Sequence, residues 1–226
     1  TTADTDGTWR VNLKPIKTKK EGQTLTIAGK NKLVYSDVLV GDVWVASGQS
    51  NMEFYLNWSA TAAQDVPQAA NSNIRLYDMK ARWRTDAVEW DASVLDSLNH
   101  LQYYKDTRWT VCSPETAGNF SAVAYYFGKK LQDSLQVPVG LICNAIGGSP
   151  TGAWVERSTL EYRFPAILRN WMQNDFIQDW VRGRAALNVK QSSNKLQRHP
   201  YEPCYLYESG IRPLEQFPVK GFIWYQ

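Results

Sequence analysis

Three short apolar runs, far apart in the chain, constrain the fold more than any other feature of the sequence. Residues 43–46, 139–143 and 221–226 each read as a buried strand, because apolar side chains follow one another there. The segment 120–135, between the first two runs, has the spacing of a helix. Buried strands that alternate with helices are typical of parallel sheets. The sequence therefore predicts an α/β fold with a mainly parallel sheet.

The predicted helix over 120–135 gathers its apolar side chains on one face. Asn119 is suited to cap its first turn, and Pro138 ends the element. A second group of apolar residues between 167 and 181 suggests one or two further helices. The apolar positions that define the first helix are Phe120, Val123, Ala124, Phe127, Leu131 and Leu135.

Polar, glycine-containing segments follow the predicted strands. Residues 48–51 follow the first strand, residues 147–149 follow the second, and Gln226 ends the third. In parallel sheets, ligands bind beyond the carboxyl ends of the strands. We therefore expect these three segments to converge on one site.

The first 40 residues have a different pattern. Residues 8–13, 23–28 and 32–35 read as short strands separated by turn residues. Three short strands make a poor fold by themselves. We therefore expect residues 1–40 to be the end of a β-sandwich domain, followed by an α/β domain over 41–226.

Composition excludes several classes of function. The 226 residues carry 25 basic and 22 acidic side chains, a net charge of +3, and no basic block that would favour nucleic acid. The run 17–20 is most simply a solvated turn. No apolar stretch approaches the length of about 18 residues that a membrane span requires. The polar first nine residues contain no signal peptide, which leaves export open.

The three cysteines, Cys112, Cys143 and Cys204, lack the spacing of metal ligands. Cys143 lies in an apolar run and is expected to be a buried thiol. A disulfide between Cys112 and Cys204 is an alternative that the sequence neither supports nor excludes. The chain is rich in aromatic residues, with 10 Trp and 12 Tyr. Flat aromatic faces suit sugar-binding clefts, but they also fill cores.

The sequence Gly48-Gln49-Ser50-Asn51 presents a hydroxyl between two amides directly after a strand. All four residue types favour turns, so a simple turn is one reading. A serine nucleophile is the other. The lipase-type elbow does not apply, because Met52 stands where that motif has its second glycine.

Four segments together resemble the sialate O-acetylesterase family of the SGNH hydrolases. Residues 43–52 resemble the family's nucleophile block, and residues 137–154 resemble its second block. Residues 120–128 look like the helix between these blocks, and 220–226 look like the strand that leads into the third. The resemblance implies an α/β/α three-layer hydrolase domain preceded by a β-domain.

The resemblance also implies roles for individual residues. Ser50 would be the nucleophile, and its own N–H would be one donor to the oxyanion. Gly148 would be a second donor, with Gly147 as the alternative because the double glycine leaves the register open by one residue. Gln49 and Asn51 are candidates to touch the substrate or to shape the loop.

Arg157 is a candidate to meet the carboxylate of an acidic sugar, and a structural salt bridge is the alternative. The resemblance implies no metal and no organic cofactor.

Two further blocks of the family have no counterpart in these 226 residues. They are a Gly-Glu-Ser-Asn segment, whose Asn is a third oxyanion donor, and an Asp-x-x-His segment, which supplies the base. We therefore expect a companion segment outside this sequence to carry them. His100 and His199 are weaker candidates for the base, because both lie in polar or proline-bounded segments.

The expected function is hydrolysis of acetyl esters on sugar hydroxyls, with 9-O-acetyl sialic acid as the family's named substrate. One alternative is an acetyl xylan esterase. Another is a catalytically incomplete fragment that binds carbohydrate or acts as a scaffold. The resemblance favours a secreted, periplasmic or lysosomal compartment.

Overall fold

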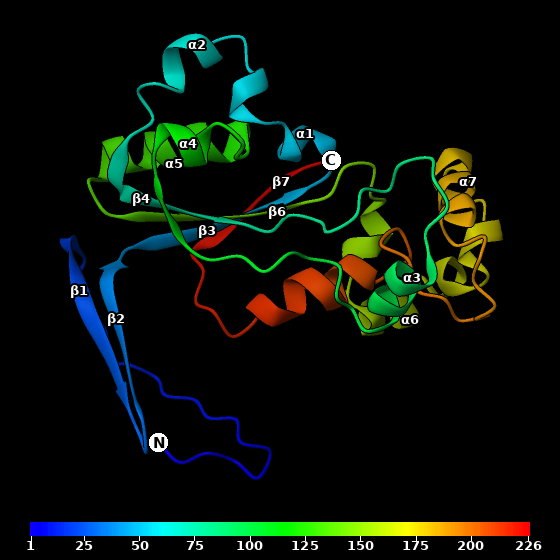
Figure 1. Cartoon of the computed structure of the whole chain (residues 1–226), viewed down its shortest axis with the longest axis horizontal. Coiled ribbons are helices and arrows are strands. Elements are labelled where there is room, and N and C mark those ends of the chain that lie inside the picture. The colour runs from blue at the N-terminus through cyan, green and yellow to red at the C-terminus, as the bar shows by residue number, and fades with distance from the viewer.

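The computed structural model describes residues 1–226 and contains a five-stranded sheet with the order β5-β4-β6-β3-β7 (Figure 1). Four of these strands are parallel, and β5 pairs antiparallel with β4 at one edge. The strands are β3 (Asp42–Gly48), β4 (Asn71–Asp78), β5 (Thr110–Cys112), β6 (Val139–Ala145) and β7 (Gly221–Tyr225). The predicted mainly parallel α/β fold is confirmed.

The central position of β6 in the sheet explains why its sequence is almost continuously apolar. All seven of its residues are buried, because β3 and β4 flank it and other elements cover both of its faces. β3 and β6 pair in register from Asp42 opposite Val139 to Gly48 opposite Ala145. The two strands therefore end at the same level, which places the loops that follow them side by side.

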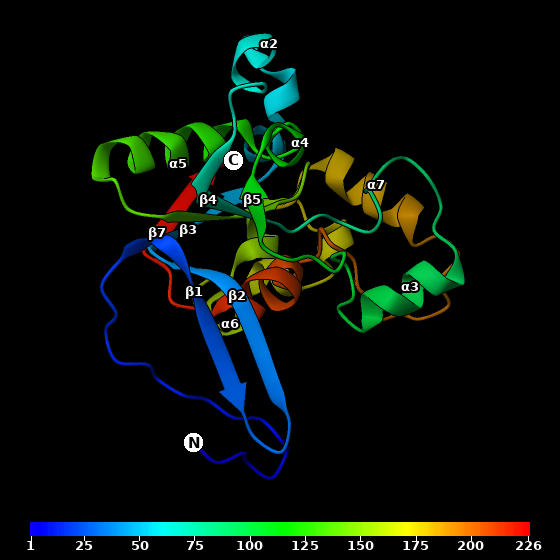
Figure 2. The ribbon, with the colours of Figure 1, turned by 60° about the vertical axis from the view of Figure 1, so that its left-hand side comes forward.

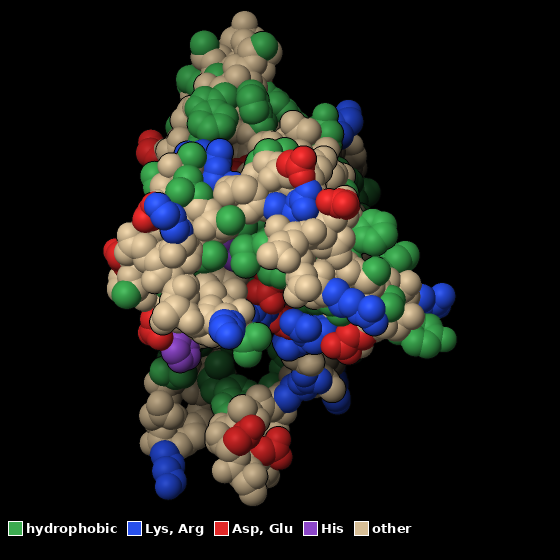
Figure 3. Space-filling model, turned by 90° about the vertical axis from the view of Figure 1, so that its right-hand side faces the viewer, with side chains coloured by type: hydrophobic (Ala, Val, Ile, Leu, Met, Phe, Trp, Pro, Cys, Tyr) green, Lys and Arg blue, Asp and Glu red, His purple; other side chains and the backbone are tan.

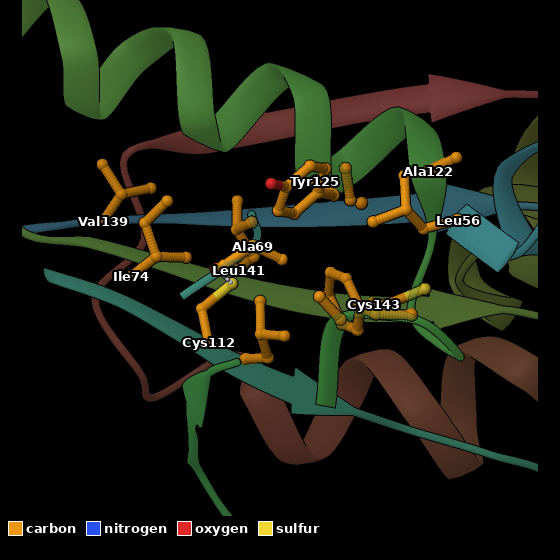
Figure 4. Close-up of a cluster of buried hydrophobic side chains, with 14 of the residues drawn as sticks. Leu56, Ala69, Ile74, Cys112, Ala122, Tyr125, Val139, Leu141 and Cys143 are labelled. Carbon is orange, nitrogen blue, oxygen red and sulfur yellow. Dashed lines mark hydrogen bonds between the residues drawn. The ribbon is translucent and has the colours of Figure 1, made fainter. Parts of the chain in front are cut away.

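The main core lies between the sheet and α5 (Ala122–Leu135). Leu141 and Cys143 from β6 and Ile74 from β4 point toward Ala122 and Tyr125 of the helix (Figure 4). Alternate side chains of the same strands point to the other face. Val45 and Ile142 pack there against Leu214, from the one-turn helix η6 (Arg212–Leu214). The sheet is thus covered on both faces in a three-layer α/β/α arrangement.

The start of α5 differs from the prediction by two residues. Ser121, rather than Asn119, is the N-cap, and its side chain accepts a hydrogen bond from Ala124 N. The Asn119 carboxamide oxygen instead accepts from Asn57 Nδ2 at 3.2 Å. The helix ends at Gln136, which has a left-handed conformation, two residues before Pro138.

The N-terminal region forms a hairpin that extends away from the main sheet (Figures 1 and 2). Its strands, β1 (Lys19–Ala28) and β2 (Lys32–Val40), pair antiparallel in a separate two-stranded sheet and contain two of the predicted strands. The prediction of a strand over 8–13 is wrong. No partner strand pairs with that segment, and Trp9, Val11 and Leu13 remain about half exposed. The assignment of residues 1–40 to a β-sandwich stays a prediction.

A long crossover joins β6 to β7 and carries most of the remaining helices. The apolar residues between 167 and 181 fall in two one-turn 3-10 helices and one α-helix, except Phe176 and Ile177, which lie outside these elements. The crossover contains η2 (Thr151–Trp154), α6 (Arg157–Arg163), η3 (Pro165–Leu168), η4 (Trp171–Gln173), α7 (Asp179–Asn188), the π-helical turn η5 (Tyr207–Ile211) and η6. The other short helices are α1 (Ser50–Glu53), η1 (Leu56–Trp58), α2 (Ala62–Asp65), α3 (Ala92–Asn99) and α4 (Pro114–Ala117).

A second core lies under this crossover and takes up many of the aromatic residues. Trp90, Tyr103, Trp154 and Tyr205 are buried in it together with Leu98 and other apolar side chains. Part of the aromatic excess of the sequence therefore fills the core, while other aromatic side chains, such as Trp58, Trp180 and Trp224, are exposed. All three cysteines are buried and free, so Cys143 is a buried thiol as predicted and no Cys112–Cys204 bond forms.

Viewed from the side of α3 and α7, basic and acidic side chains are interspersed (Figure 3). This face carries no broad patch of one sign, in keeping with the small net charge of +3. None of the helices has the length and apolar character needed to cross a membrane.

Candidate active site

The three segments that follow β3, β6 and β7 meet at one edge of the sheet, as predicted. Gln49 N donates to Tyr225 O at 3.2 Å, and Ile146 N donates to Gly48 O at 3.1 Å. The Gln226 side chain donates through Nε2 to Ser149 O at 3.0 Å. These contacts fix the relative positions of the three strand ends.

Ser50 is the first residue of α1 and is exposed at this edge. Its hydroxyl donates to Gln49 Oε1 at 2.9 Å, and its backbone N–H points to the same oxygen at 3.2 Å. Gly148 N also donates to Gln49 Oε1, at 3.3 Å. The structure thus brings Gln49, Ser50 and Gly148 together around a single oxygen atom.

The two adjacent glycines have different partners. Gly147 N donates to the Glu53 carboxylate at 2.8 Å, so this N–H is already engaged within the protein fold. Gly148 has a φ of +74°, and a Cβ on it would lie 2.5 Å from the Tyr201 hydroxyl oxygen. Only glycine fits there without strain. Of the two, Gly148 is the residue whose N–H faces Ser50 and Gln49.

Tyr201 holds the same loop from the other side. Its hydroxyl donates to Gly147 O at 2.9 Å and lies within hydrogen-bonding distance of the Thr85 hydroxyl. Gly147 is therefore bound through its N–H by Glu53 and through its carbonyl by Tyr201. The loop is clamped before it reaches Gly148.

Glu53 lies three residues after Ser50, and both line the same cavity. Burial raises the pKa of the Glu53 carboxyl, while the hydrogen bond from Gly147 and the charge of Arg84 act in the opposite direction. The position of this carboxyl makes it a group that orients the loop.

Two cavities flank the Gln49 side chain. The smaller, of about 240 Å³, contains Ser50, and the larger, of about 490 Å³, contains Gln49. Gly148 and Trp180 line both cavities. Other residues of the smaller cavity are Glu53, Arg84, Thr85, Asp86, Arg184 and Tyr201. Other residues of the larger cavity are Pro150, Ile167, Phe176, Val181 and Gln226.

The remaining predicted residues lie in different environments. Asn51 is adjacent to the site, where its Nδ2 makes a long hydrogen bond of 3.4 Å to Gln226 O. Arg157 lines neither cavity. Its guanidinium forms ion pairs with Glu208 at 3.4 Å and with Glu161 at 3.9 Å. The structure therefore does not bring Arg157 to Ser50. Its contacts are those of a structural salt bridge, the alternative considered from the sequence.

His199 is completely buried, and both of its ring nitrogens have partners. Nδ1 accepts from Tyr201 N at 2.9 Å, so Nε2 carries the proton and donates to Asn188 Oδ1 at 3.2 Å. Burial lowers the pKa of His199 to about 3. His100 is exposed, and its Nδ1 contacts Asp96 O at the end of α3. Neither ring is among the residues that line the two cavities.

Glu53, Tyr201, Arg84 and Arg184 belong to the site but do not stand out in the sequence. Glu53 offered one local signal, because a side chain three residues after Ser50 on a helical turn lies near it. The other three come from distant segments, and no spacing links them to Ser50. No group of three or more His, Cys, Asp or Glu side chains is arranged to hold a metal ion.

Comparisons with known proteins point to one family. A family model described as carbohydrate esterase, sialic acid-specific acetylesterase, matches residues 40–226. The chain is 31% identical over 244 residues to a sialate O-acetylesterase of Rattus norvegicus, which covers 97% of this chain and 41% of that protein. It is 28% identical over 230 residues to the sialate O-acetylesterase of Homo sapiens, with 97% and 38% coverage.

A crystal structure of a carbohydrate acetylesterase from Xanthomonas citri superimposes with a TM-score of 0.70 at 30% identity. The match covers 99% of this chain and 41% of that one. The chain thus spans about two fifths of the length of the rat and bacterial proteins that it matches. The matches to the family model, to the curated relatives and to the solved structure coincide over the sheet and its three strand-end loops. The chain belongs to the carbohydrate esterase family of sialic acid-specific acetylesterases.

Proposed function

We propose that this chain provides the nucleophile and the oxyanion donors of a serine esterase that removes acetyl groups from sugar hydroxyls. One observation carries the proposal. The Ser50 hydroxyl, the Ser50 N–H and the Gly148 N–H all point to one oxygen, that of the Gln49 side chain. Acyl transfer needs this set: a hydroxyl beside backbone donors that converge on the developing oxyanion.

In the reaction, Ser50 Oγ attacks the carbonyl carbon of the acetyl ester while its proton passes to a base. The carbonyl electron pair moves onto oxygen, where the N–H groups of Ser50 and Gly148 stabilise the negative charge. The oxyanion then re-forms the carbonyl as the bond between the acetyl carbon and the sugar oxygen breaks. The base gives its proton to that oxygen, so the sugar leaves as the neutral alcohol. Water hydrolyses the acetyl-Ser50 ester and releases acetate.

The base is proposed to come from a companion segment that lies outside these 226 residues. The contacts of the resident histidines support this: His199 uses both ring nitrogens within the core, and His100 lies on the surface beside Asp96. The exposed edge of the sheet gives further support, since Phe222, Trp224 and Tyr225 of β7 are each about half exposed. Such an apolar edge is suited to contact with further polypeptide.

The proposed substrate is an O-acetylated acidic sugar, with 9-O-acetyl sialic acid as the leading candidate. Two arginines in the Ser50 cavity support an anionic substrate. Arg184 is oriented by a 2.6 Å hydrogen bond from Nη1 to Thr85 O and forms no ion pair, and Arg84 contacts Asp86 only at 4.0 Å. A guanidinium with free donors is suited to a carboxylate. A neutral acetylated xylan is the second candidate, because Trp180 and Phe176 present exposed aromatic faces beside the larger cavity.

The proposal is tested with Ser50→Ala in the full-length protein. We expect release of acetate from O-acetylated sialic acid to fall by at least about a thousandfold, as when a nucleophile is removed from a serine hydrolase. Ser47→Ala is the matched control, because Ser47 Oγ is buried in the preceding strand without a hydrogen-bond partner. Full acetate release by Ser50→Ala would exclude the serine mechanism. Saccharide binding without turnover in both proteins would favour a binding module.

The substrate class is tested by comparing acetate release from O-acetylated sialic acid and from acetylated xylan. Arg184→Gln is expected to reduce turnover of the acidic sugar about tenfold and to leave xylan unchanged. Arg182→Gln is the control, because Arg182 is on the same helix but pairs with Asp175 and Asp179. Equal losses on both substrates would argue against recognition of a carboxylate.

A further inference from the structure

The Gln49 carboxamide occupies the position that the proposed reaction assigns to the acyl oxygen. Its Oε1 accepts from Ser50 Oγ at 2.9 Å, from Ser50 N at 3.2 Å and from Gly148 N at 3.3 Å. A carboxamide oxygen and an ester carbonyl oxygen are both sp² acceptors. Both therefore suit the same donors in the same geometry. The two cannot occupy this position at once.

The contact also keeps the nucleophile in an unreactive arrangement. The Ser50 hydroxyl proton is directed at a neutral amide oxygen, which cannot remove it. Attack on an ester needs this proton to point toward a base. Withdrawal of the Gln49 side chain would therefore release the hydroxyl as well as the two N–H groups.

The cavities on either side of this side chain show where it could go. Gln49 lines only the larger cavity, of about 490 Å³, and Ser50 lines only the smaller one, of about 240 Å³. Gly148 and Trp180 line both. The Gln49 side chain therefore lies at the boundary between them, with free space on its own side.

We propose that Gln49 is a gate, a positioning residue whose carboxamide takes the place of the ester in the resting site and rotates into the larger cavity when substrate binds. This inference rests on the proposed function, because that function assigns the three donors their role. Opening the gate joins the two cavities, so that an acetylated sugar can extend to both sides of Ser50.

The gate has a measurable effect on affinity. If the site binds its ligand only when Gln49 has rotated away, the apparent affinity equals the affinity of the open site multiplied by the fraction of molecules that are open. Removing the competing oxygen should therefore strengthen the binding of any carboxylate or carbonyl oxygen to these donors. A side-chain oxygen that competes more strongly for the donors should weaken this binding.

The test uses the full-length protein labelled with nitrogen-15 serine and glycine, and acetate ion, the expected product, as the probe. Gln49→Met keeps the length of the side chain but removes the acceptor, and Gln49→Glu replaces it with a charged acceptor. We expect the amide signals of Ser50 and Gly148 to report an acetate Kd about tenfold lower for Gln49→Met than for wild type. For Gln49→Glu we expect a Kd at least about tenfold higher, because hydrogen bonds to a charged acceptor are stronger.

Gln178→Met is the matched control. Gln178 lines the same larger cavity, but its carboxamide oxygen accepts from Trp180 Nε1 rather than from the three donors. Acetate Kd values within twofold of one another in wild type, Gln49→Met, Gln49→Glu and Gln178→Met would overturn the gate. An effect of Gln178→Met equal to that of Gln49→Met would also overturn it. If Gln49→Met does not fold, an unchanged Kd in Gln49→Glu overturns it alone.

The binding readout separates this inference from the proposed function. Acetate titration reports competition for the donors and needs no turnover. The expected order of Kd values together with full acetate release by Ser50→Ala would refute the serine mechanism and leave the competition standing. Acetate release that depends on Ser50, with no effect of Gln49 substitutions on acetate binding, would support the serine mechanism and overturn the gate.

Discussion

The loop after β6 and the turn after β3 each bring a backbone donor to the site, but they are held in different ways. Gly147 is bound by Glu53 and Tyr201, while Ser149 is bound by Gln226 and by Trp154 Nε1 at 2.9 Å. Tyr201 and Trp154 are themselves buried, and Glu53 is half-buried. The Gln49 side chain in the turn, by contrast, makes its hydrogen bonds to Ser50 and Gly148, the donors that the proposed reaction assigns to the substrate. The site thus combines a rigid loop with one movable side chain.

Gly148→Ala should distort the rigid loop and have the largest effect among the changes that test this comparison. The new Cβ would lie 2.5 Å from the Tyr201 hydroxyl oxygen and 2.9 Å from Trp180, at a residue whose φ is +74°. We expect acetate release to fall by at least about a hundredfold, the scale of losing one oxyanion donor, and the melting temperature to fall. Gly183→Ala in α7 is the control. Its Cβ would meet nothing within 4 Å, so that variant should be as stable as wild type or slightly more so.

Tyr201→Phe tests the clamp on the Gly147 carbonyl. Loss of the hydroxyl leaves that carbonyl and the Thr85 hydroxyl without this partner, at a cost of about 1–3 kcal/mol in the free energy of unfolding. We expect kcat to fall about tenfold with little change in KM, because Gly148 loses its orientation. Tyr103→Phe is the control, since its buried hydroxyl has no hydrogen-bond partner. Equal urea midpoints for these two variants would contradict the clamp.

Acidification should weaken the same loop through His199, whose Nδ1 accepts from Tyr201 N. The folded-state pKa is about 3, well below the ordinary value of 6.5, so the unfolded chain takes up a proton first as the pH falls. This contribution to stability is complete above pH 6.5 and decreases from there toward pH 3. We expect a loss of about 1 kcal/mol in the free energy of unfolding between pH 7 and 5.5.

Urea unfolding at both pH values measures this loss, with His199→Asn for comparison. That substitution should reduce the pH dependence. The raised pKa values of Glu53, Asp78 and Glu202 act in the opposite direction, since those carboxyls favour the folded state on protonation. An identical pH dependence in His199→Asn and wild type would contradict the assignment.

Asn51→Ala should have the smallest effect, because it changes the turn rather than the loop. Its one side-chain hydrogen bond, to Gln226 O, is long at 3.4 Å and exposed. We expect the free energy of unfolding to change by less than about 0.5 kcal/mol. A rise in KM at unchanged stability would sharpen the comparison by showing that Asn51 touches the substrate. A large loss of stability would show that the turn is as firmly held as the loop.

The sequence predicted those parts of the molecule that local patterns determine. β3, β6 and β7 are predicted as strands because parallel strands between helices are apolar over several consecutive residues. The expectation that 221–226 is buried is wrong, because β7 is an edge strand and its Phe222, Trp224 and Tyr225 are about half exposed. α5 was predicted from its periodicity. β4 is not predicted, because only Ile74 and Leu76 of its eight residues are buried. The 8–13 segment alternates as a strand does but has no neighbour to pair with.

The site could be predicted only where it lies within the strand-end segments. Ser50 and Gly148 follow predicted strands, so their convergence followed from the topology of a parallel sheet. Glu53 binds Gly147 across 94 residues and Tyr201 binds it across 54, and no local pattern encodes either contact. Arg157 is a sequence candidate for a carboxylate, with a salt bridge as the alternative; Glu208 engages it, and Arg184 comes to the Ser50 cavity from another helix.

The long crossover between β6 and β7 has a consequence for how proteins of this architecture diversify. Ser50 and Gly148 are supplied by the ends of neighbouring strands, whereas Ile167, Phe176 and Trp180 of the larger cavity come from the crossover. The proposed reacting groups and the apolar wall of the larger cavity are therefore encoded in separate stretches of the gene. A crossover transplanted between two relatives, with Tyr201 retained to hold the loop, should transfer the donor protein's sugar preference onto an unchanged reaction centre.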